Sequence, residues 1–448
     1  MIKFCFIVGL ILAVMSCTPG AKTSVSVHVE GTQAMGKAGV QTPDSLYAVA
    51  FDSTGSAVIT LAENVKPGYA SINYGRLQLP VYIEPGKSFD VVLKVEGRRI
   101  NPTFTGEGAK KNEYLNGSSF QRVRPDFKAD EDAFISSMEE MEKQLVAALD
   151  SMGFDAQFNQ LEKKRIHYMI YSYLPMYPSY HTYYANDRTY KPSARYYEVL
   201  KAAVPEEGAL ADMAEYQRML SSAISALANK DMENYDALQY VKNELEYVQS
   251  NIKNPELAEK LVDEYATRYV ERSGVDHLPE IAPVYNAKVT SADKKAKFDE
   301  LCGKWAKIAK GQPSPEFKYL DINGKEVELK DLAGKYVYID VWATWCGPCR
   351  GELPHLKELE HQFKGKNIAF VSISCDQDKA AWEKMVKEEK LEGIQLHFGN
   401  DQTFMNNYMI RGIPRFILLD REGKILAAEM TRPSNPKTVE TFNALEGI

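Results

Sequence analysis

Two cysteines separated by two residues, Cys346 and Cys349 in the segment TWCGPCRGEL, have a spacing that suggests redox chemistry. The continuous apolar run over residues 336–343 predicts a strand buried on both faces, and the leucines that follow predict a helix. Cys346 would then lie at the N-terminus of that helix, where unpaired backbone N–H groups and the helix dipole favour a thiolate over a thiol. A thiolate attacks disulfides, and Cys349, one helical turn later, would resolve the mixed disulfide.

A C-x-x-C pair can also form half of a zinc site, which needs two further Cys or His ligands at short spacing. The seven histidines are scattered, and Cys302 and Cys375 are isolated, so the ligand count argues against zinc. A peroxiredoxin would need a proline-threonine-cysteine motif, which the residues around Thr344 do not supply. We therefore expect a redox dithiol without a metal or another cofactor, and no bridge between Cys302 and Cys375.

The stretch YVYIDVWATWCGPCRGELPHL closely resembles thioredoxin, above all through Trp345 and the Cys-Gly-Pro-Cys motif after it. Glu352 and Pro354, together with the predicted hairpin FKYLDINGKEVEL, resemble the membrane-tethered TlpA/ResA-like branch. The resemblance covers residues 312–448 and implies a thioredoxin-like α/β fold, which the alternating strand and helix patterns also favour. It further implies that Trp345, Gly347 and Pro348 contact the substrate.

Ile413 and Pro414, in the segment MIRGIPRFILLD, match the cis-proline loop that faces the dithiol in this family. The resemblance implies that the backbone of Ile413 is free to pair with an extended substrate segment. The alternative is a proline in an ordinary turn before a strand.

Two acidic residues complete the predicted site. Asp340 lies six residues before Cys346 in an otherwise apolar strand, where burial should raise its pKa. It could then take the proton of Cys349 through a water, and the resemblance places the family's buried acid here. Glu352 lies on the same helical face as Cys349 and resembles the glutamate of the ResA-like branch. The alternative for Glu352 is a solvated helix residue.

The first residues, MIKFCFIVGLILAVMSCTPG, read as a secretory signal, because the apolar run over residues 4–15 is too short to span a membrane. The run ends at Cys17 in a sequence that resembles a bacterial lipobox, which implies that Cys17 is lipidated and becomes the mature N-terminus. The alternative is a cleaved signal with an incidental cysteine. We expect a lipoprotein signal peptide over residues 1–17 and a flexible tether over residues 18–24.

The spacing of apolar residues along the remaining chain changes twice, which predicts a multidomain protein. A two-residue period predicts an N-terminal antiparallel, β-sandwich-like domain over residues 25–120. A helical period predicts a central α-helical domain over residues 121–308, with helices at 206–229, 232–252 and 255–273. A Gly/Pro/Ser linker over residues 308–317 leads into the thioredoxin-like domain, residues 309–448, which we call the redox domain.

A tyrosine-dense segment spans residues 168–197 of the helical region. It could form an aromatic platform that binds peptide or carbohydrate. We favour instead a loop-rich cap whose tyrosines pack against the helices while their hydroxyls face water.

The chain has 448 residues and a net charge of −7, which argues against a nucleic-acid partner. We expect a lipid-anchored thiol-disulfide oxidoreductase facing the periplasm in the cell envelope. Gly-Pro between the cysteines resembles the reducing members of the superfamily. The resemblance therefore implies oxidised envelope proteins such as apocytochrome c as substrates, a role in cytochrome c biogenesis, and a membrane thiol electron carrier as partner. The alternative is a ligand- or protein-binding envelope lipoprotein that uses the thioredoxin fold mainly as scaffold.

Overall fold

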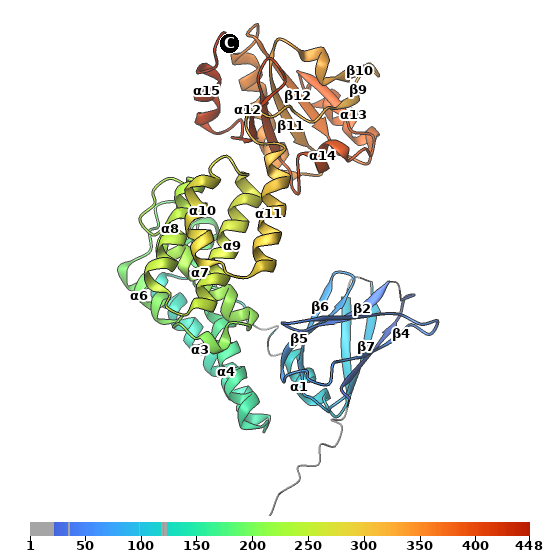
Figure 1. Ribbon diagram of the computed structural model, residues 1–448, viewed down its shortest axis with the longest axis vertical. Coiled ribbons are helices and arrows are strands. Elements are labelled where there is room, and N and C mark those ends of the chain that lie inside the picture. Colours follow the sequence, from blue (N-terminus) through green and yellow to red (C-terminus); the bar gives the residue numbers. More distant parts are fainter. Residues whose placement is uncertain (1–21, 35, 98, 118–119, 121–122) are drawn as a thin grey trace, which may run out of the picture. The chain divides into compact units, whose positions relative to one another are not determined.

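The computed structural model describes residues 22–448 except 35, 98, 118–119 and 121–122 (Figure 1). It divides into two compact units, one ending at Leu227 and the other beginning at Ala228. The predicted signal peptide, Cys17 with its predicted lipidation, and most of the predicted tether lie outside the described residues. In the described part of the chain, none of the helices is both long and apolar enough to span a bilayer.

The N-terminal part of the first unit consists of two four-stranded sheets. One has the order β4-β1-β7-β8 and the other the order β3-β2-β5-β6. Neighbouring strands are antiparallel except β1 and β7, which are parallel, and the predicted antiparallel β domain is thus confirmed with one parallel pair. Alternate side chains, such as Val25 and Val27, are buried in a shared core. The strands are β1 Ser24–Glu30, β2 Lys37–Gln41, β3 Leu46–Ala50, β4 Ser56–Thr60, β5 Gly68–Tyr74, β6 Leu77–Ile83, β7 Phe89–Glu96 and β8 Arg99–Gly106.

The sheet begins before the end of the predicted tether. Thr23 is 3% exposed, its Oγ1 accepts a hydrogen bond from the backbone N–H of Gly86 at 2.7 Å, and its carbonyl accepts one from Leu61 at 2.9 Å. Ser24 already pairs with Thr60 in β1. The expectation of a tether up to residue 24 is therefore wrong at residues 23 and 24, because backbone pairing with two neighbouring segments holds them in the sheet.

Helices make up the rest of the first unit. The longest, α3, buries Phe134, Met138, Leu145 and Leu149 on the face that the four- and three-residue spacing predicts. Asp130 and Asp155 cap α3 and α4, since their side chains accept hydrogen bonds from backbone N–H groups three residues later. The helices are α1 Ala109–Leu115, α3 Glu131–Ser151, α4 Ala156–Tyr171, α5 Tyr177–Tyr184, α6 Ala194–Ala202, the 3₁₀ helix η1 Gly208–Leu210, and α7 Ala214–Ala228.

The tyrosine-dense segment packs against these helices, but its buried hydroxyls do not face water. Tyr177 and Tyr196 are fully buried, and their hydroxyls donate to the carbonyls of Ala129 at 2.8 Å and Leu174 at 2.7 Å. In contrast, Tyr183 is 76% exposed. The segment also forms helix α5 and the start of α6, so it is more regular than the predicted loop-rich cap.

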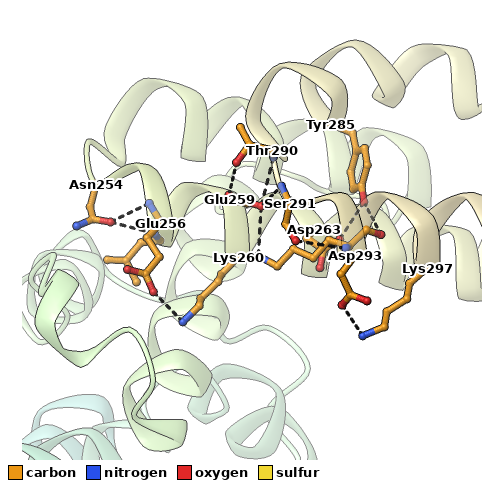
Figure 2. Close-up of polar contacts among 12 residues, drawn as sticks. Asn254, Glu256, Glu259, Lys260, Asp263, Tyr285, Thr290, Ser291, Asp293 and Lys297 are labelled. Atoms are coloured by element: carbon orange, nitrogen blue, oxygen red, sulfur yellow. Dashed lines mark hydrogen bonds and ion pairs between the residues drawn. The ribbon is translucent and has the colours of Figure 1, made fainter. Parts of the chain in front are cut away.

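The second unit begins with four helices, α8 Ala237–Asn251, α9 Pro255–Ser273, α10 Leu278–Lys288 and α11 Ala292–Ala306. The bounds of α9 match the predicted 255–273, while α7 and α8 begin several residues later than predicted. Asn254 caps α9 by accepting from the N–H groups of Glu256 and Leu257 (Figure 2). Gly274, with φ of 74°, ends the helix.

Polar contacts join α9 to the helices that follow it (Figure 2). The carboxylate of Glu259 accepts hydrogen bonds from Thr290 and Ser291, which lie just before α11. The hydroxyl of Tyr285 on α10 donates to Asp263 on α9 at 3.0 Å. Helices α9, α10 and α11 therefore form one connected body.

The redox domain contains a seven-stranded sheet with the order β10-β9-β13-β12-β11-β14-β15. All residues of β11 are buried, as the apolar run predicts for a central strand. The predicted hairpin corresponds to β9 and β10, and the thioredoxin-like α/β class is confirmed. The elements are β9 Lys318–Asp321, β10 Glu326–Glu328, η2 Leu329–Leu332, β11 Tyr336–Trp342, α12 Gly347–Gln362, β12 Ile368–Ser374, α13 Lys379–Glu388, β13 Ile394–His397, α14 Thr403–Asn407, β14 Arg415–Leu419, β15 Ile425–Met430 and α15 Pro436–Asn443.

The predicted linker is bound to the redox domain. The N–H of Gly311 donates to the carbonyl of Ile425 at 2.7 Å, and the N–H of Ile425 donates to Gln312 at 2.8 Å. Ser314 is 6% exposed, and its hydroxyl lies 2.6 Å from that of Tyr408. This segment thus lines the edge of β15.

Candidate active site

The dithiol motif lies where the central strand turns into a helix. After β11, the N–H of Cys346 donates to the carbonyl of Ala343 at 3.1 Å, which closes a turn, and α12 starts at the next residue. Cys346 is the N-cap of α12, and its sulfur accepts a hydrogen bond from the N–H of Cys349 at 3.2 Å. Cys346 thus occupies the predicted position at the helix N-terminus. The two cysteines are joined by a disulfide, so the structure shows the oxidised pair.

The disulfide is buried among apolar side chains and borders a cavity. Cys346 is 5% and Cys349 3% exposed, and they pack with Trp342, Leu353 and Trp382. Cys346 borders a cavity of about 960 Å³, and Trp345, 70% exposed, stands at its edge. The other lining residues are Thr344, Gly347, Pro348, Cys375, Asp376, Gln377, Asp378, Phe398, Gln402, Met405, Arg411, Gly412 and Ile413.

The loop before β14 faces the disulfide. The peptide bond between Ile413 and Pro414 is cis, as the resemblance implies. The carbonyl oxygen of Ile413 lies 3.8 Å from Sγ of Cys346, and Ile413 lines the same cavity. The structure therefore brings together Cys346, Cys349 and Ile413, which are up to 67 residues apart in the sequence.

Asp340 occupies the middle of β11, opposite Ser372 of β12 and Phe416 of β14. It is 4% exposed. Burial, with smaller contributions from the charges of Glu360 and Glu352, raises the pKa of Asp340 to about 8. The predicted raised pKa of Asp340 is thus confirmed.

Glu352 lies on α12 and is 9% exposed. Its carboxylate accepts hydrogen bonds from the N–H of Ser434 at 3.0 Å and from the hydroxyl of Ser434 at 2.9 Å. The alternative of a solvated helix residue is therefore wrong, because the segment between β15 and α15 covers the carboxylate. The structure binds Glu352 to Ser434 and brings its charge close enough to raise the pKa of Asp340.

Sequence reasoning did not single out Asp376, Glu360 or Arg411. Asp376 is 1% exposed and hydrogen-bonded to Thr344, and Arg411 lines the cavity. Burial and the charge of Glu392 raise the pKa of Glu360 to about 7. For Asp376, the available signal was an acidic residue two positions after the apolar segment IAFVSIS.

The two remaining cysteines of the described chain are free, as expected. Burial raises the pKa of the Cys302 thiol to about 11. Burial and the charge of Asp376 likewise raise the pKa of Cys375 to about 11, although Cys375 borders the cavity. Within residues 22–448, apart from the few positions omitted, no three His, Cys, Asp or Glu side chains gather into a possible metal site.

The Redoxin family profile matches residues 309–445 of this chain. A thiol-disulfide oxidoreductase ResA of Bacillus cereus is 32% identical over 120 residues, which cover 27% of this chain and 69% of that protein. ResA of Bacillus subtilis is 30% identical over 119 residues, which cover 27% of this chain and 66% of that relative.

Two structures from Bacteroides vulgatus are also similar over the C-terminal part. A solution structure of a protein provisionally named a thiol-disulfide oxidoreductase is 69% identical, covers 30% of this chain and 88% of its own, and has a TM-score of 0.28. A crystal structure of the thioredoxin domain of a thiol-disulfide oxidoreductase is 33% identical, covers 30% of this chain and 96% of its own, and has a TM-score of 0.29.

The similarity to ResA of Bacillus cereus extends over more than two thirds of that relative, at 32% identity. The matched region is the one that carries the disulfide at the start of α12. The chain therefore belongs to the TlpA/ResA-like family of thiol-disulfide oxidoreductases.

Proposed function

We propose that this oxidoreductase reduces disulfides of proteins in the cell envelope, and that Cys346 attacks the substrate while Cys349 resolves the mixed disulfide. The observation that carries the proposal is the Cys346–Cys349 pair at the N-terminus of α12, next to a cavity that the cis-proline loop also lines. An N-cap position stabilises the Cys346 thiolate over the thiol.

The reaction has two exchanges of sulfur bonds. The Cys346 thiolate attacks one sulfur of the substrate disulfide, which forms a mixed disulfide and releases the other substrate sulfur as a thiolate. The Cys349 thiolate then attacks Sγ of Cys346, and the second substrate sulfur leaves. The enzyme ends in the oxidised form seen here, and the substrate has gained two electrons.

Asp340 in its ionised form, the minor form at pH 7 for a pKa of about 8, accepts the proton of Cys349 through a water before the second exchange. A pKa of about 8 lies close to that of a thiol, so proton transfer between the two groups is nearly balanced in energy. Glu352 supports this role, since its charge helps to raise the pKa of Asp340.

The cavity supports a binding mode for the substrate. An extended segment pairs with the backbone of Ile413 and lies against Trp345, Gly347 and Pro348, which border the cavity near Cys346. Because Trp345 is 70% exposed, it has a large apolar surface to offer to such a segment.

The lipid anchor at Cys17 and the periplasm-facing location rest on the lipobox-like sequence. Each turnover leaves the Cys346–Cys349 pair oxidised, so a membrane thiol electron carrier must reduce it again. Apocytochrome c is a candidate substrate by family resemblance.

Reduction of insulin by the full chain in detergent tests the proposal. With dithiothreitol as electron donor, the chain should precipitate the insulin B chain faster than dithiothreitol alone. Cys346→Ser should remove this increase, and Cys302→Ser should keep it. A wild-type chain that adds nothing to the rate with dithiothreitol would contradict the proposal.

A further inference from the structure

Asp376, a buried acidic residue two positions after the end of β12, has no role in the mechanism above. Asp376 is 1% exposed, and its two carboxylate oxygens accept from the N–H of Thr344 at 2.9 Å and 3.2 Å. It accepts two more from hydroxyl groups, those of Thr344 at 2.7 Å and Ser374 at 2.8 Å. All of these contacts come from donors, which fits a carboxylate in its ionised form.

These hydrogen bonds hold the loop that leads to the nucleophile. Thr344 lies in the turn between β11 and α12, two residues before Cys346, and the preceding residue, Ala343, accepts the N–H of Cys346. Because Asp376 holds both the backbone N–H and the hydroxyl of Thr344, it fixes this turn at two points. The position of Cys346 at the start of α12 follows from the turn.

The charge of Asp376 also reaches one sulfur atom at the cavity, that of Cys375. Thr344, Asp376 and Cys346 line the same cavity, together with Cys375. The charge of Asp376 contributes to the raised pKa of Cys375, second only to burial. Because Asp376 is buried, its negative charge is screened less by water and salt than a surface charge would be.

We propose that Asp376 is a positioning residue of the redox site, which holds the Thr344 turn and makes the Cys346–Cys349 dithiol more reducing through its fixed negative charge. The proposal rests on the proposed function, since it concerns the same dithiol. A negative charge destabilises the reduced form whenever Cys346 is a thiolate, whereas the uncharged disulfide is not affected. Asp376 thus favours oxidation of the dithiol and transfer of its electrons to the substrate.

Asp376→Asn separates the charge from the hydrogen bonds. The amide oxygen can take the position that accepts from the N–H of Thr344 and the hydroxyl of Ser374. The amide nitrogen can donate to the Thr344 hydroxyl, which rotates to accept. The variant therefore loses the charge and keeps the three shorter contacts, while the longer contact of the Thr344 N–H with Oδ1, at 3.2 Å, is lost. Thr344→Val does the reverse, because it removes one hydrogen bond and keeps the charge.

Asp378→Asn is the matched control for a change of charge at this cavity. Asp378 lines the same cavity and caps α13 by accepting from the N–H of Ala381 at 3.1 Å, but it is exposed to water. Water and salt screen its charge, so its loss should affect the dithiol far less than the loss of the buried charge.

The experiment equilibrates the full chain with glutathione and glutathione disulfide at pH 7. In this exchange the protein dithiol becomes a disulfide while one glutathione disulfide becomes two thiols. For Asp376→Asn, the equilibrium should shift at least about threefold toward the protein dithiol, which corresponds to a potential about 14 mV higher. Alkylation of Cys346 in the reduced protein should become faster. Asp378→Asn and Thr344→Val should each shift the equilibrium less than about twofold.

An unchanged equilibrium in folded Asp376→Asn would overturn the inference, as would an equal shift in Asp378→Asn. If Asp376→Asn does not fold, Asp376→Ser carries the same expectation, because its hydroxyl can also accept a hydrogen bond. The proposed function fails in a different way, namely when the wild-type dithiol does not exchange with glutathione. If the wild-type dithiol exchanges with glutathione and Asp376→Asn has the same equilibrium constant as the wild type, only this inference is contradicted.

Discussion

Arg411, next to the cis-proline loop, forms an ion pair with Glu271 near the end of α9, with 2.7 Å between Nη1 and Oε1. Arg411 lines the cavity beside Cys346, so a helix outside the redox domain contacts a residue of the candidate active site. Both side chains are largely open to water, 69% and 38% exposed respectively. An ion pair this exposed contributes little to the stability of the fold.

Glu271→Gln should therefore lower the free energy of unfolding by less than about 1 kcal/mol. Glu244→Ala should lower it by about 3 kcal/mol, since it leaves Arg268 without the buried carboxylate that holds it at 2.6 Å. Urea unfolding of both variants measures the difference. Equal losses of stability in the two variants would show that the buried ion pair contributes no more to the free energy of unfolding than the exposed one.

The two cysteines of the motif should give different phenotypes. Cys346→Ser should abolish reduction, because no nucleophile is left to attack the substrate. Cys349→Ser should accumulate covalent mixed disulfides, since the resolving thiol is missing. Non-reducing gels followed by mass spectrometry detect these adducts. If Cys346→Ser stays active and Cys349→Ser traps nothing, the order of attack is wrong.

Asp340→Asn should stabilise the fold increasingly as the pH rises. The folded pKa of about 8 lies above the ordinary value of 3.8, so the folded state holds the proton more tightly than the unfolded state. The wild type loses stability between these two pH values, while the variant has no carboxyl to ionise. The difference in free energy of unfolding between Asp340→Asn and the wild type should grow by roughly 1 kcal/mol per pH unit between pH 5 and pH 7. Urea midpoints that move in parallel over this range would refute the shifted pKa.

The same substitution should slow the second exchange. Loss of the proton acceptor should reduce the resolution rate at pH 7 by about tenfold, and the first attack by Cys346 should be largely kept. The defect should shrink at alkaline pH, where Cys349 ionises unaided. Stopped-flow decay of a preformed mixed disulfide measures this step. An unchanged decay at pH 7 would assign the proton transfer to water or to Glu352.

Cys17 lies outside the described residues, and its lipidation can be tested in cells. The mature wild-type chain should partition into the detergent phase, and Cys17→Ser should appear in the soluble fraction. Cys5→Ser serves as control, because Cys5 leaves with the signal peptide in this interpretation. A wild-type chain that is already soluble after export would rule out the anchor.

The sequence predicted those features that depend on neighbouring residues. The apolar run around Asp340 specified a central strand, and the residues after it placed Cys346 at a helix N-terminus. Asn254 and Pro255 marked the start of α9, since one caps the helix and the other suits its first turn.

Features that depend on distant partners could not be predicted. Thr344 and Asp376 are 32 residues apart, and Arg411 and Glu271 are 140 apart. Whether an acidic residue is buried with donors or solvated depends on such partners, and the local pattern around Asp376 is compatible with both. The same holds for Glu352, whose burial comes from Ser434, 82 residues later.

The hydrogen bonds between the predicted linker and β15 determine where a fragment containing the redox domain should start. A fragment that starts at residue 312 loses the Gly311 bond to Ile425 and puts a charged terminus next to the remaining pairing of Gln312 with the same residue. Ser314, buried against Tyr408, holds the segment further along. The glycine and prolines of residues 308–317 are typical of a flexible linker that proteases cleave. The hydrogen bonds to β15 should instead make this segment resistant to proteolysis. Expression of the redox domain alone should therefore begin upstream of Gly311.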